Sequence, residues 1–307
     1  MTVAATDLSF GFVCTPSAPG VEALEALPID SLWVGGHVAS TNPTPEAMVQ
    51  LVQLAALTRR VRIGTSILLL PLYPPAIVAK QIADLDRATG GRVTLGVGIG
   101  GEYPQEFRAC QIPIGERGPR TDEAIAVLRE MWSGEERTYA GRFYSMDAVR
   151  IHPAPHQVGG PPIVVAGRKQ PAMRRAATLG DGWMPYLYSA RRYGESVATI
   201  TQLAAEAERD LADFEWFAFV FVNVDDDAAR AQEETADFLG GTYRQGFREM
   251  LDRVAIAGSP DDVVRGFEQF ALAGARHFVI APATRTDGSA VVERIVDRVI
   301  PRVLASP

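Results

Sequence analysis

Short apolar runs alternate with stretches of helical periodicity along nearly the whole chain. A parallel strand that helices cover on both faces reads as a continuous apolar run, because neither direction of its side chains meets water. Eight runs have this character: Leu8–Val13, Ser31–Val34, Val61–Leu68, Val93–Val97, Pro162–Ala166, Trp183–Tyr186, Trp216–Val224 and His277–Ala281. The pattern therefore predicts eight buried parallel strands.

The segments between these runs carry the signals of amphipathic helices. Thr44-Pro45-Glu46 offers a capping hydroxyl, a proline for the first helical position and an acid for the first turn. Apolar residues at 48, 51, 52 and 55 then form one face. Ser259-Pro260-Asp261 predicts another helix start of the same kind. Each strand is thus followed by a helix.

Strand and helix in regular alternation indicate a (β/α)8 barrel, which typically needs about 250 residues. The chain has 307 residues, and we expect them to form one domain over residues 1–307. We interpret the surplus as loop insertions at the C-terminal rim, in Tyr103–Pro119, Gly134–Gly160 and Gly240–Gly258. The alternative architecture is an open doubly wound sheet.

Composition narrows the classes of function. A net charge of -7 argues against a nucleic-acid footprint, which needs a basic face. The longest apolar run, from Ile67 to Ala79, is interrupted by prolines and is too short to cross a bilayer. No signal peptide is visible, and two cysteines are too few for a disulfide framework. We expect a cytoplasmic protein that acts on a small molecule.

Gly96-Val97-Gly98-Ile99-Gly100-Gly101 matches the Gly-x-Gly-x-x-Gly pattern of dinucleotide sites. However, the pattern should lead directly into a helix after the first strand, whereas here Glu102-Tyr103-Pro104 follows the fourth. Two interpretations stay open. The glycines form a tight turn with positive φ, or their backbone N–H groups hold an anionic cofactor tail.

Polar residues at other strand ends each allow two interpretations, one structural and one functional. His37 closes the second strand, where a structural role and a proton-transfer role are both open. Glu102 and Asp225 together suggest a glycosidase, although Asp225-Asp226-Asp227 is typical of a solvated helix start. Arg168 is either a phosphate ligand or a solvated charge. The remaining histidines lack the neighbours that a metal site needs, so no metal is expected.

Taken together, the motifs resemble the luciferase-like monooxygenase superfamily, and within it the F420-dependent oxidoreductases of actinobacteria. The resemblance spans roughly residues 8 to 305. The segments that carry it are Gly64-Thr65-Ser66-Ile67, Leu95–Glu102, Glu106-Phe107, Glu116-Arg117-Gly118, Asp122-Glu123, Gly141-Arg142-Phe143-Tyr144, Arg174–Ala177 and Gly180–Trp183.

This resemblance implies that the barrel mouth holds coenzyme F420, with FMN as the alternative. In such proteins a non-prolyl cis peptide often ends the third strand and backs the ring, which here is the bond between Ser66 and Ile67. The residues Gly98, Ile99, Gly100 and Gly101 would approach the cofactor tail. The phosphate would be held by Ala166, Gly167 and Arg168.

The implied activity is hydride transfer between a reduced deazaflavin and a small organic substrate. His37 would contact the cofactor and exchange a proton, and Glu102 is the second candidate for catalysis. Related deazaflavin enzymes often carry an acid directly before this histidine, where this chain has Gly36. The alternatives are a reduced-FMN-dependent monooxygenase and a flavin-binding barrel without activity. The resemblance also suggests a homodimer formed through outer helices.

Overall fold

The computed structural model describes residues 8–41 and 43–306. Eight parallel strands form a closed ring, in which β10 pairs with both β12 and β9. In order around the ring they are β1 (Ser9–Val13), β2 (Ser31–Val34), β3 (Arg62–Thr65), β5 (Val93–Gly98), β8 (Ile163–Ala166), β9 (Gly182–Met184), β10 (Glu215–Val224) and β12 (His277–Pro282). The predicted (β/α)8 barrel is confirmed, and the open doubly wound sheet is wrong.

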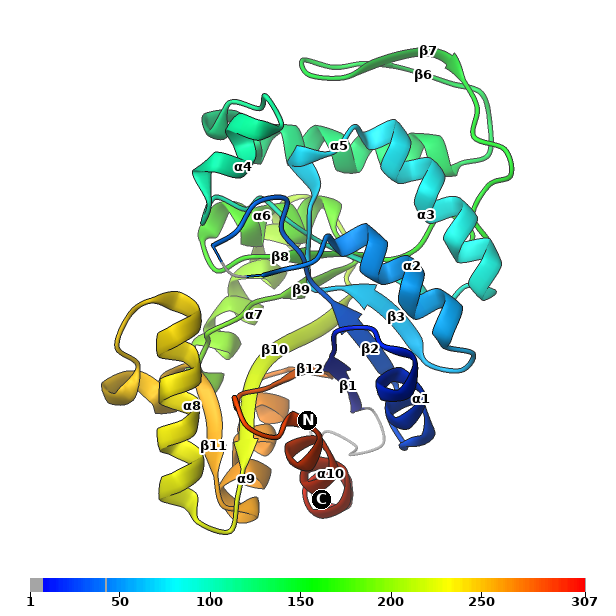
Figure 1. The fold of residues 1–307 in the computed structure, drawn as a ribbon. Helices are drawn as coiled ribbons and strands as arrows, with labels where there is room; N and C mark the ends of the chain where they lie inside the picture. Colours follow the sequence, from blue (N-terminus) through cyan, green and yellow to red (C-terminus); the bar gives the residue numbers. More distant parts are fainter. Residues whose placement is uncertain (1–7, 42, 307) are drawn as a thin grey trace.

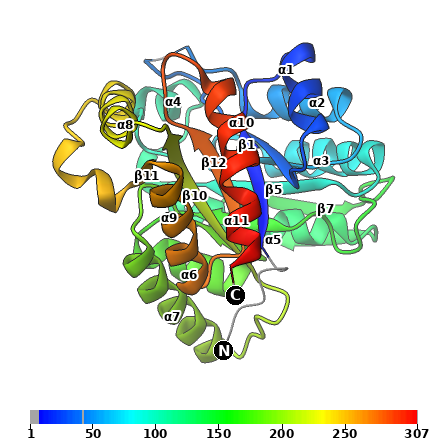
Figure 2. The same cartoon turned by 90° about the horizontal axis from the view of Figure 1, so that it is seen from below.

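Helices surround this ring, as Figures 1 and 2 show. They are α1 (Ala18–Ala26), α2 (Ala47–Leu57), α3 (Pro75–Thr89), α5 (Arg117–Trp132), α6 (Gln170–Leu179), α7 (Ala190–Glu206), α8 (Ala228–Tyr243), α9 (Pro260–Leu272), α10 (Gly288–Arg298) and α11 (Ile300–Ala305). Ser259 caps α9 as predicted, in a reciprocal capping box with Asp262. The predicted cap of α2 is wrong by two residues. The carboxylate of Glu46, rather than the hydroxyl of Thr44, accepts hydrogen bonds from the first turn.

The barrel interior is filled by large apolar side chains from five strands. Trp33, Val164, Met184, Phe217 and Val279 form this cluster and are at most 2% exposed. Because the interior is packed solid, a ligand can reach only the ends of the barrel. The carboxyl ends of the strands meet at one end, here called the mouth.

Two of the three predicted insertions border the mouth. Residues 103–119 form α4 (Pro104–Ala109), the 3-10 turn η3 (Ile114–Glu116) and the start of α5. Residues 240–258 form the end of α8, η4 (Arg248–Arg253) and the short strand β11 (Ala255–Gly258).

The third insertion differs from the expectation. Residues 134–160 contain the hairpin β6 (Arg137–Ala140) and β7 (Ser145–Val149), which lies outside α5 (Figure 1). The Glu123 carboxylate on α5 accepts hydrogen bonds from the backbone N–H groups of the hairpin tip, residues 142–144. The position follows from the topology, because this segment connects the end of a helix to the start of β8.

Candidate active site

The predicted third strand is interrupted at the mouth. It divides into β3 and the two-residue strand β4 (Leu68–Leu69), and the peptide bond between Ser66 and Ile67 lies between them in the cis configuration. The predicted cis bond is therefore present. The Ile67 side chain reaches Gly98 on β5, where an added Cβ would overlap Ile67 Cδ1. Glycine at 98 is thus what admits this side chain.

The glycine-rich segment after β5 forms a tight turn. Gly100 has φ of 61° and Gly101 has φ of 118°. Residues other than glycine rarely adopt backbone conformations with such positive φ. Helix α4 begins only at Pro104 and has six residues. The turn interpretation is confirmed, and the segment does not build the strand-to-helix junction of a dinucleotide site.

Two buried polar side-chain atoms near the strand ends have no hydrogen-bond partner. Among the described residues, Ser66 Oγ and Arg117 Nε make no hydrogen bond. The Arg117 side chain starts α5 and lies against Gly101, while its Nη1 donates to the carbonyl of Ile114 at 2.7 Å. Buried polar groups are normally paired, so each atom is a candidate contact for a bound polar group.

His37 has an acidic partner that sequence reasoning did not assign. Its Nδ1 lies 3.1 Å from Oε1 of Glu106 on α4. Glu106 is fully buried, and its Oε2 also accepts the backbone N–H of Val38 at 2.7 Å. The ring of Tyr103 packs edge-on against the imidazole, with 4.9 Å between centroids. The contacts fix the orientation of the imidazole and leave its Nε2 free of this network.

Glu102, the second predicted catalytic residue, belongs to a different cluster. Its Oε1 accepts a hydrogen bond of 2.7 Å from the hydroxyl of Tyr186, at the end of β9. The Arg168 guanidinium lies over the Tyr186 ring, 4.6 Å from its centroid. Burial, together with the nearby Glu102 carboxylate, raises the pKa of Tyr186 to about 12. Tyr186 is therefore a neutral donor at physiological pH.

The end of β8 adjoins these groups. Ala166 is the last residue of β8, and Gly167 follows with φ of 137°. The Gly167 carbonyl accepts a hydrogen bond from Trp183 Nε1 at 2.9 Å. The structure thus gathers the predicted residues of β2, β3, β5 and β8, which are neighbours in the ring, along one side of the mouth.

Other residues considered from the sequence lie elsewhere. Asp225 binds Arg230 and accepts the N–H of Asp227, which caps α8, so the helix-start reading is confirmed. His277 lies at the other end of the barrel, with its Nδ1 within hydrogen-bond distance of Ser9 Oγ. Within residues 8–41 and 43–306, no group of three or more His, Cys, Asp or Glu could hold a metal ion. None of the helices described is long and apolar enough to span a membrane.

Comparison of the chain with known proteins identifies related sequences. The model of the luciferase-like monooxygenase family matches residues 20–277. The F420-dependent glucose-6-phosphate dehydrogenase of Beutenbergia cavernae is 31% identical over 303 residues, covering 90% of this chain and 89% of that protein. The 4-hydroxyprotoasukamycin monooxygenase of Streptomyces nodosus subsp. asukaensis is 29% identical over 274 residues, covering 79% and 73%.

Solved structures share the fold. An F420-dependent secondary alcohol dehydrogenase, in complex with an F420-acetone adduct, superposes with a TM-score of 0.85 at 21% identity, covering 96% of this chain and 99% of that one. The coenzyme F420 dependent tetrahydromethanopterin reductase of Methanopyrus kandleri has a TM-score of 0.82 at 20% identity, with the same coverage. At these identities the similarity concerns the architecture alone.

Proposed function

The chain belongs to the luciferase-like monooxygenase family, and we propose that it is an oxidoreductase that uses coenzyme F420. When bound, this cofactor carries a hydride to or from a small organic substrate. The name of the Beutenbergia cavernae relative, which aligns over 90% of this chain, supports F420 as the cofactor.

The observation that carries the proposal is the seat at the end of β3. The apolar Ile67 side chain packs into Gly98, with the unpartnered Ser66 Oγ beside it. A flat ring resting on Ile67 would cover this apolar surface, and a polar ring atom would supply the missing partner of Ser66. The residues present therefore fit a deazaflavin or flavin ring.

The residues beside the seat fit the acidic tail of the cofactor. We assign the backbone of Gly98, Ile99, Gly100 and Gly101 to the tail, with the unpaired Arg117 Nε behind the turn. Ala166, Gly167 and Arg168 would hold the phosphate. Arginine suits this role because its planar guanidinium matches the geometry of phosphate oxygens.

His37 is our candidate for proton exchange with the substrate. The Glu106 carboxylate occupies Nδ1 and so favours the tautomer that leaves Nε2 able to accept a proton. Glu102 remains the second candidate, although its hydrogen bond from Tyr186 favours a role in shaping the site.

Titration of the purified protein with F420 and with FMN tests the cofactor. We expect F420 fluorescence to change saturably, with no oxygen uptake when the reduced cofactor is present. Tight binding of FMN alone, with oxygen uptake after reduction, would establish the monooxygenase alternative, for which the Streptomyces relative is a precedent. Tight binding without turnover of any substrate would indicate a flavin-binding barrel.

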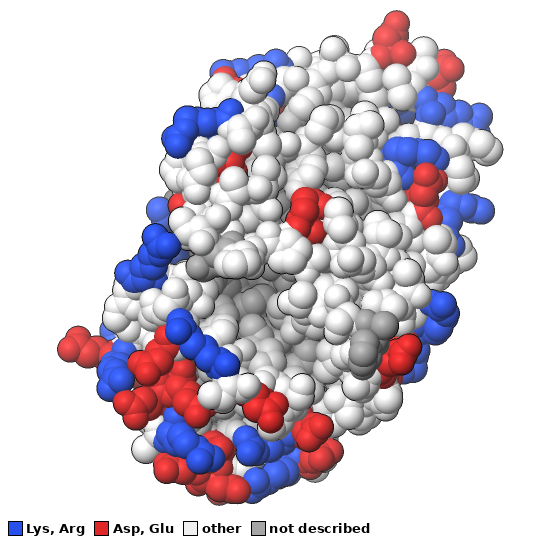
Figure 3. Space-filling view, viewed as in Figure 1, with Lys and Arg blue, Asp and Glu red and all other residues white. Residues whose placement is uncertain are grey.

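We further propose a homodimer formed through α2. This helix contains no charged residue, and Val49 and Val52 on its outer side are 57% and 52% exposed. Ile77 on α3 adds a third exposed apolar side chain. Figure 3 shows that the face around α2 is largely free of Lys, Arg, Asp and Glu. Light scattering should give a dimer that Val52→Glu converts to a monomer, and a monomeric parent protein would refute this.

The remaining expectations concern the setting of the protein. We propose the cytoplasm, because Cys14 and Cys110 are both free thiols. We also propose that nucleic acid is not a partner, because the net charge is -7.

A further inference from the structure

The seat for the ring faces a particular strand across the mouth. In the ring of eight strands, β10 is four places from β3 in either direction and so lies diametrically opposite. Ile67, after β3, and Phe219, on β10, pack from above against the same interior cluster. A substrate that lies on the exposed face of a ring seated at Ile67 would therefore meet Phe219.

Strand β10 presents a row of aromatic rings on its inner face. Phe217 is buried inside the barrel, Phe219 is partly exposed at the mouth, and Phe221 is buried again. Phe221 is covered by Tyr243 at the end of α8, with 6.0 Å between ring centroids. Tyr243 also stacks with Tyr186 at 6.3 Å. Phe219 is thus the ring of this row that remains open to a ligand.

We call the surface opposite the seat the wall and define it as Val13, Phe219, Tyr186 and Tyr243. None of these four side chains is charged at neutral pH. Burial raises the pKa of Tyr243 well above its ordinary value, so its hydroxyl stays neutral. The Glu102 carboxylate, which contacts the wall, accepts a hydrogen bond from the Tyr186 hydroxyl. The Arg168 guanidinium lies over the Tyr186 ring, 4.6 Å from its centroid, but it is assigned above to the cofactor phosphate. With that arginine engaged, an anionic substrate placed here would lose its hydration without gaining a cation of its own.

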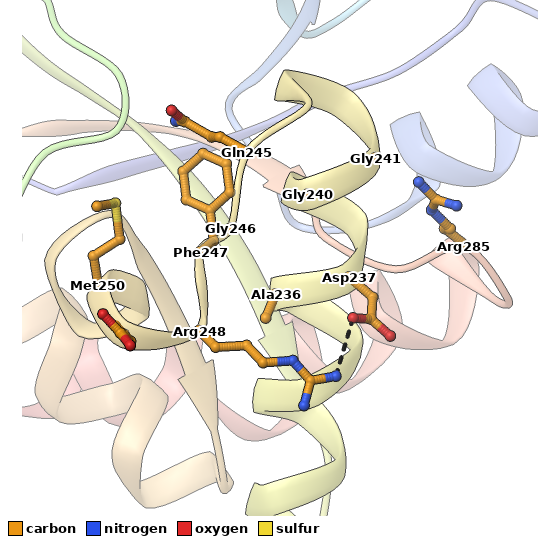
Figure 4. Close-up of a pocket in the computed structure, with 11 residues that line it drawn as sticks. Ala236, Asp237, Gly240, Gly241, Gln245, Gly246, Phe247, Arg248, Met250 and Arg285 are labelled. Atoms are coloured by element: carbon orange, nitrogen blue, oxygen red, sulfur yellow. Dashed lines mark hydrogen bonds and ion pairs between the residues drawn. The ribbon is translucent and has the colours of Figure 1, made fainter.

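Cations do lie behind the wall, in a cavity of about 660 Å³ along α8 (Figure 4). Arg248 there is already paired with Glu233 and Asp237, and Arg285 lies against Gly241. Phe247 lines this cavity and also packs on Tyr243, with 5.9 Å between centroids. The arginines line this cavity, and the residue that it shares with the packing of the wall is the apolar Phe247.

From this arrangement we propose that the substrate is an uncharged and largely apolar organic molecule, bound between the ring seat and the wall. The inference rests on the proposed function for the position of the cofactor. It separates this chain from a sugar phosphate as substrate, the class named for the 31% identical relative.

Ligand-observed saturation-transfer NMR with cyclohexanone and with glucose 6-phosphate tests this inference, each with and without F420. The two probes have six-membered rings but differ in charge and polarity. We expect saturation transfer to cyclohexanone only, and a loss of affinity of about tenfold or more in both Phe219→Ala and Tyr243→Ala. Tyr139→Ala, on the distant hairpin, is the matched control and should change nothing.

The outcomes separate the inference from the proposed function. If glucose 6-phosphate binds in preference and Arg285→Ala abolishes its binding, the apolar assignment is overturned. If neither probe binds in the presence of bound F420, or if the wall variants leave the binding of cyclohexanone unchanged, it is overturned as well. Failure of F420 itself to bind would refute the cofactor proposal. Even then, loss of cyclohexanone binding in the two wall variants would support the proposal that the wall binds an apolar substrate.

Discussion

The imidazole Nδ1 of His37 lies 3.1 Å from Oε1 of Glu106, which stands 69 positions later in the chain. The chain lacks an acid directly before this histidine, and helix α4 supplies one from another part of the fold. Because Glu106 is completely buried and also holds the backbone of Val38, its position is fixed by more than one contact.

Replacing Glu106 should reduce turnover more than cofactor binding. In Glu106→Gln the amide can donate to Nδ1 as well as accept from it, so the tautomer that leaves Nε2 able to accept a proton is no longer fixed, and we expect kcat to fall about a hundredfold. The affinity for F420 should change less than about threefold. Adding His37→Ala to Glu106→Gln should lower kcat little further than His37→Ala alone, because residues that act as a unit are not additive. Steady-state kinetics and F420 titration measure both effects.

The matched control for this variant is Glu116→Gln, which removes an ion pair with Arg120. Wild-type kcat in Glu106→Gln would contradict the positioning role of Glu106, even if the variant were less stable. A decrease of about 1–3 kcal/mol in the free energy of unfolding is expected, since buried hydrogen bonds are lost.

A single methyl group at position 98 should disrupt the ring seat. In Gly98→Ala the new Cβ would overlap Ile67 Cδ1, so the Ile67 side chain must move. Overpacking of this kind costs about 1–3 kcal/mol, and we expect F420 affinity to fall at least tenfold. Gly115→Ala is the control, because no atom lies within 4 Å of a Cβ there. Unchanged F420 binding in a folded Gly98→Ala protein would argue against a ring at Ile67.

Arg117 should contribute to binding of the cofactor tail. Arg117→Met keeps the length of the side chain and removes the unpartnered Nε. A charge-assisted hydrogen bond contributes about 1.5–3 kcal/mol, so the dissociation constant for F420 should rise roughly tenfold to a hundredfold. The control is Arg142→Met, whose guanidinium lies over Phe143 on the hairpin. Equal affinities for F420 in the two variants would refute this role.

The Cys14 thiol at the end of β1 should react slowly. Burial raises the pKa of Cys14 from its ordinary value of 9.0 to about 12. The thiolate is the reactive form, and a rise of this size lowers its fraction near neutral pH about a thousandfold. In Cys110→Ser, a disulfide reagent at pH 8 should modify Cys14 far more slowly in the native state than in urea. A reaction as fast as that of the unfolded protein would show that the mouth around Cys14 is open.

The strands were predictable because a strand that is buried on both faces has a continuous apolar run in its sequence. The cis bond between Ser66 and Ile67 was implied by the family resemblance, and it is present in the structure. The partner of His37 was not predictable, because nothing near His37 in sequence points to Glu106. A buried acid on a short helix after the glycine turn was the available signal, and its meaning depends on tertiary packing.

Other differences have local causes. Glu46 replaces Thr44 as the cap of α2 because both of its carboxylate oxygens reach backbone N–H groups of the first turn. The strand β11 was missed because it pairs only with the last four residues of the long strand β10. Such pairing depends on which strands are neighbours in the tertiary fold, and a single sequence does not reveal those neighbours.

The length of β10 affects how the protein can change over evolution. Its first residues pair with β9 and its last with β11, so Phe219 stands on continuous sheet backbone instead of a loop. The half of the mouth assigned to the cofactor is built on other strands. A mutation of the aromatic row can therefore alter the choice of substrate while the redox group keeps its place, which makes this strand the natural site for diversification.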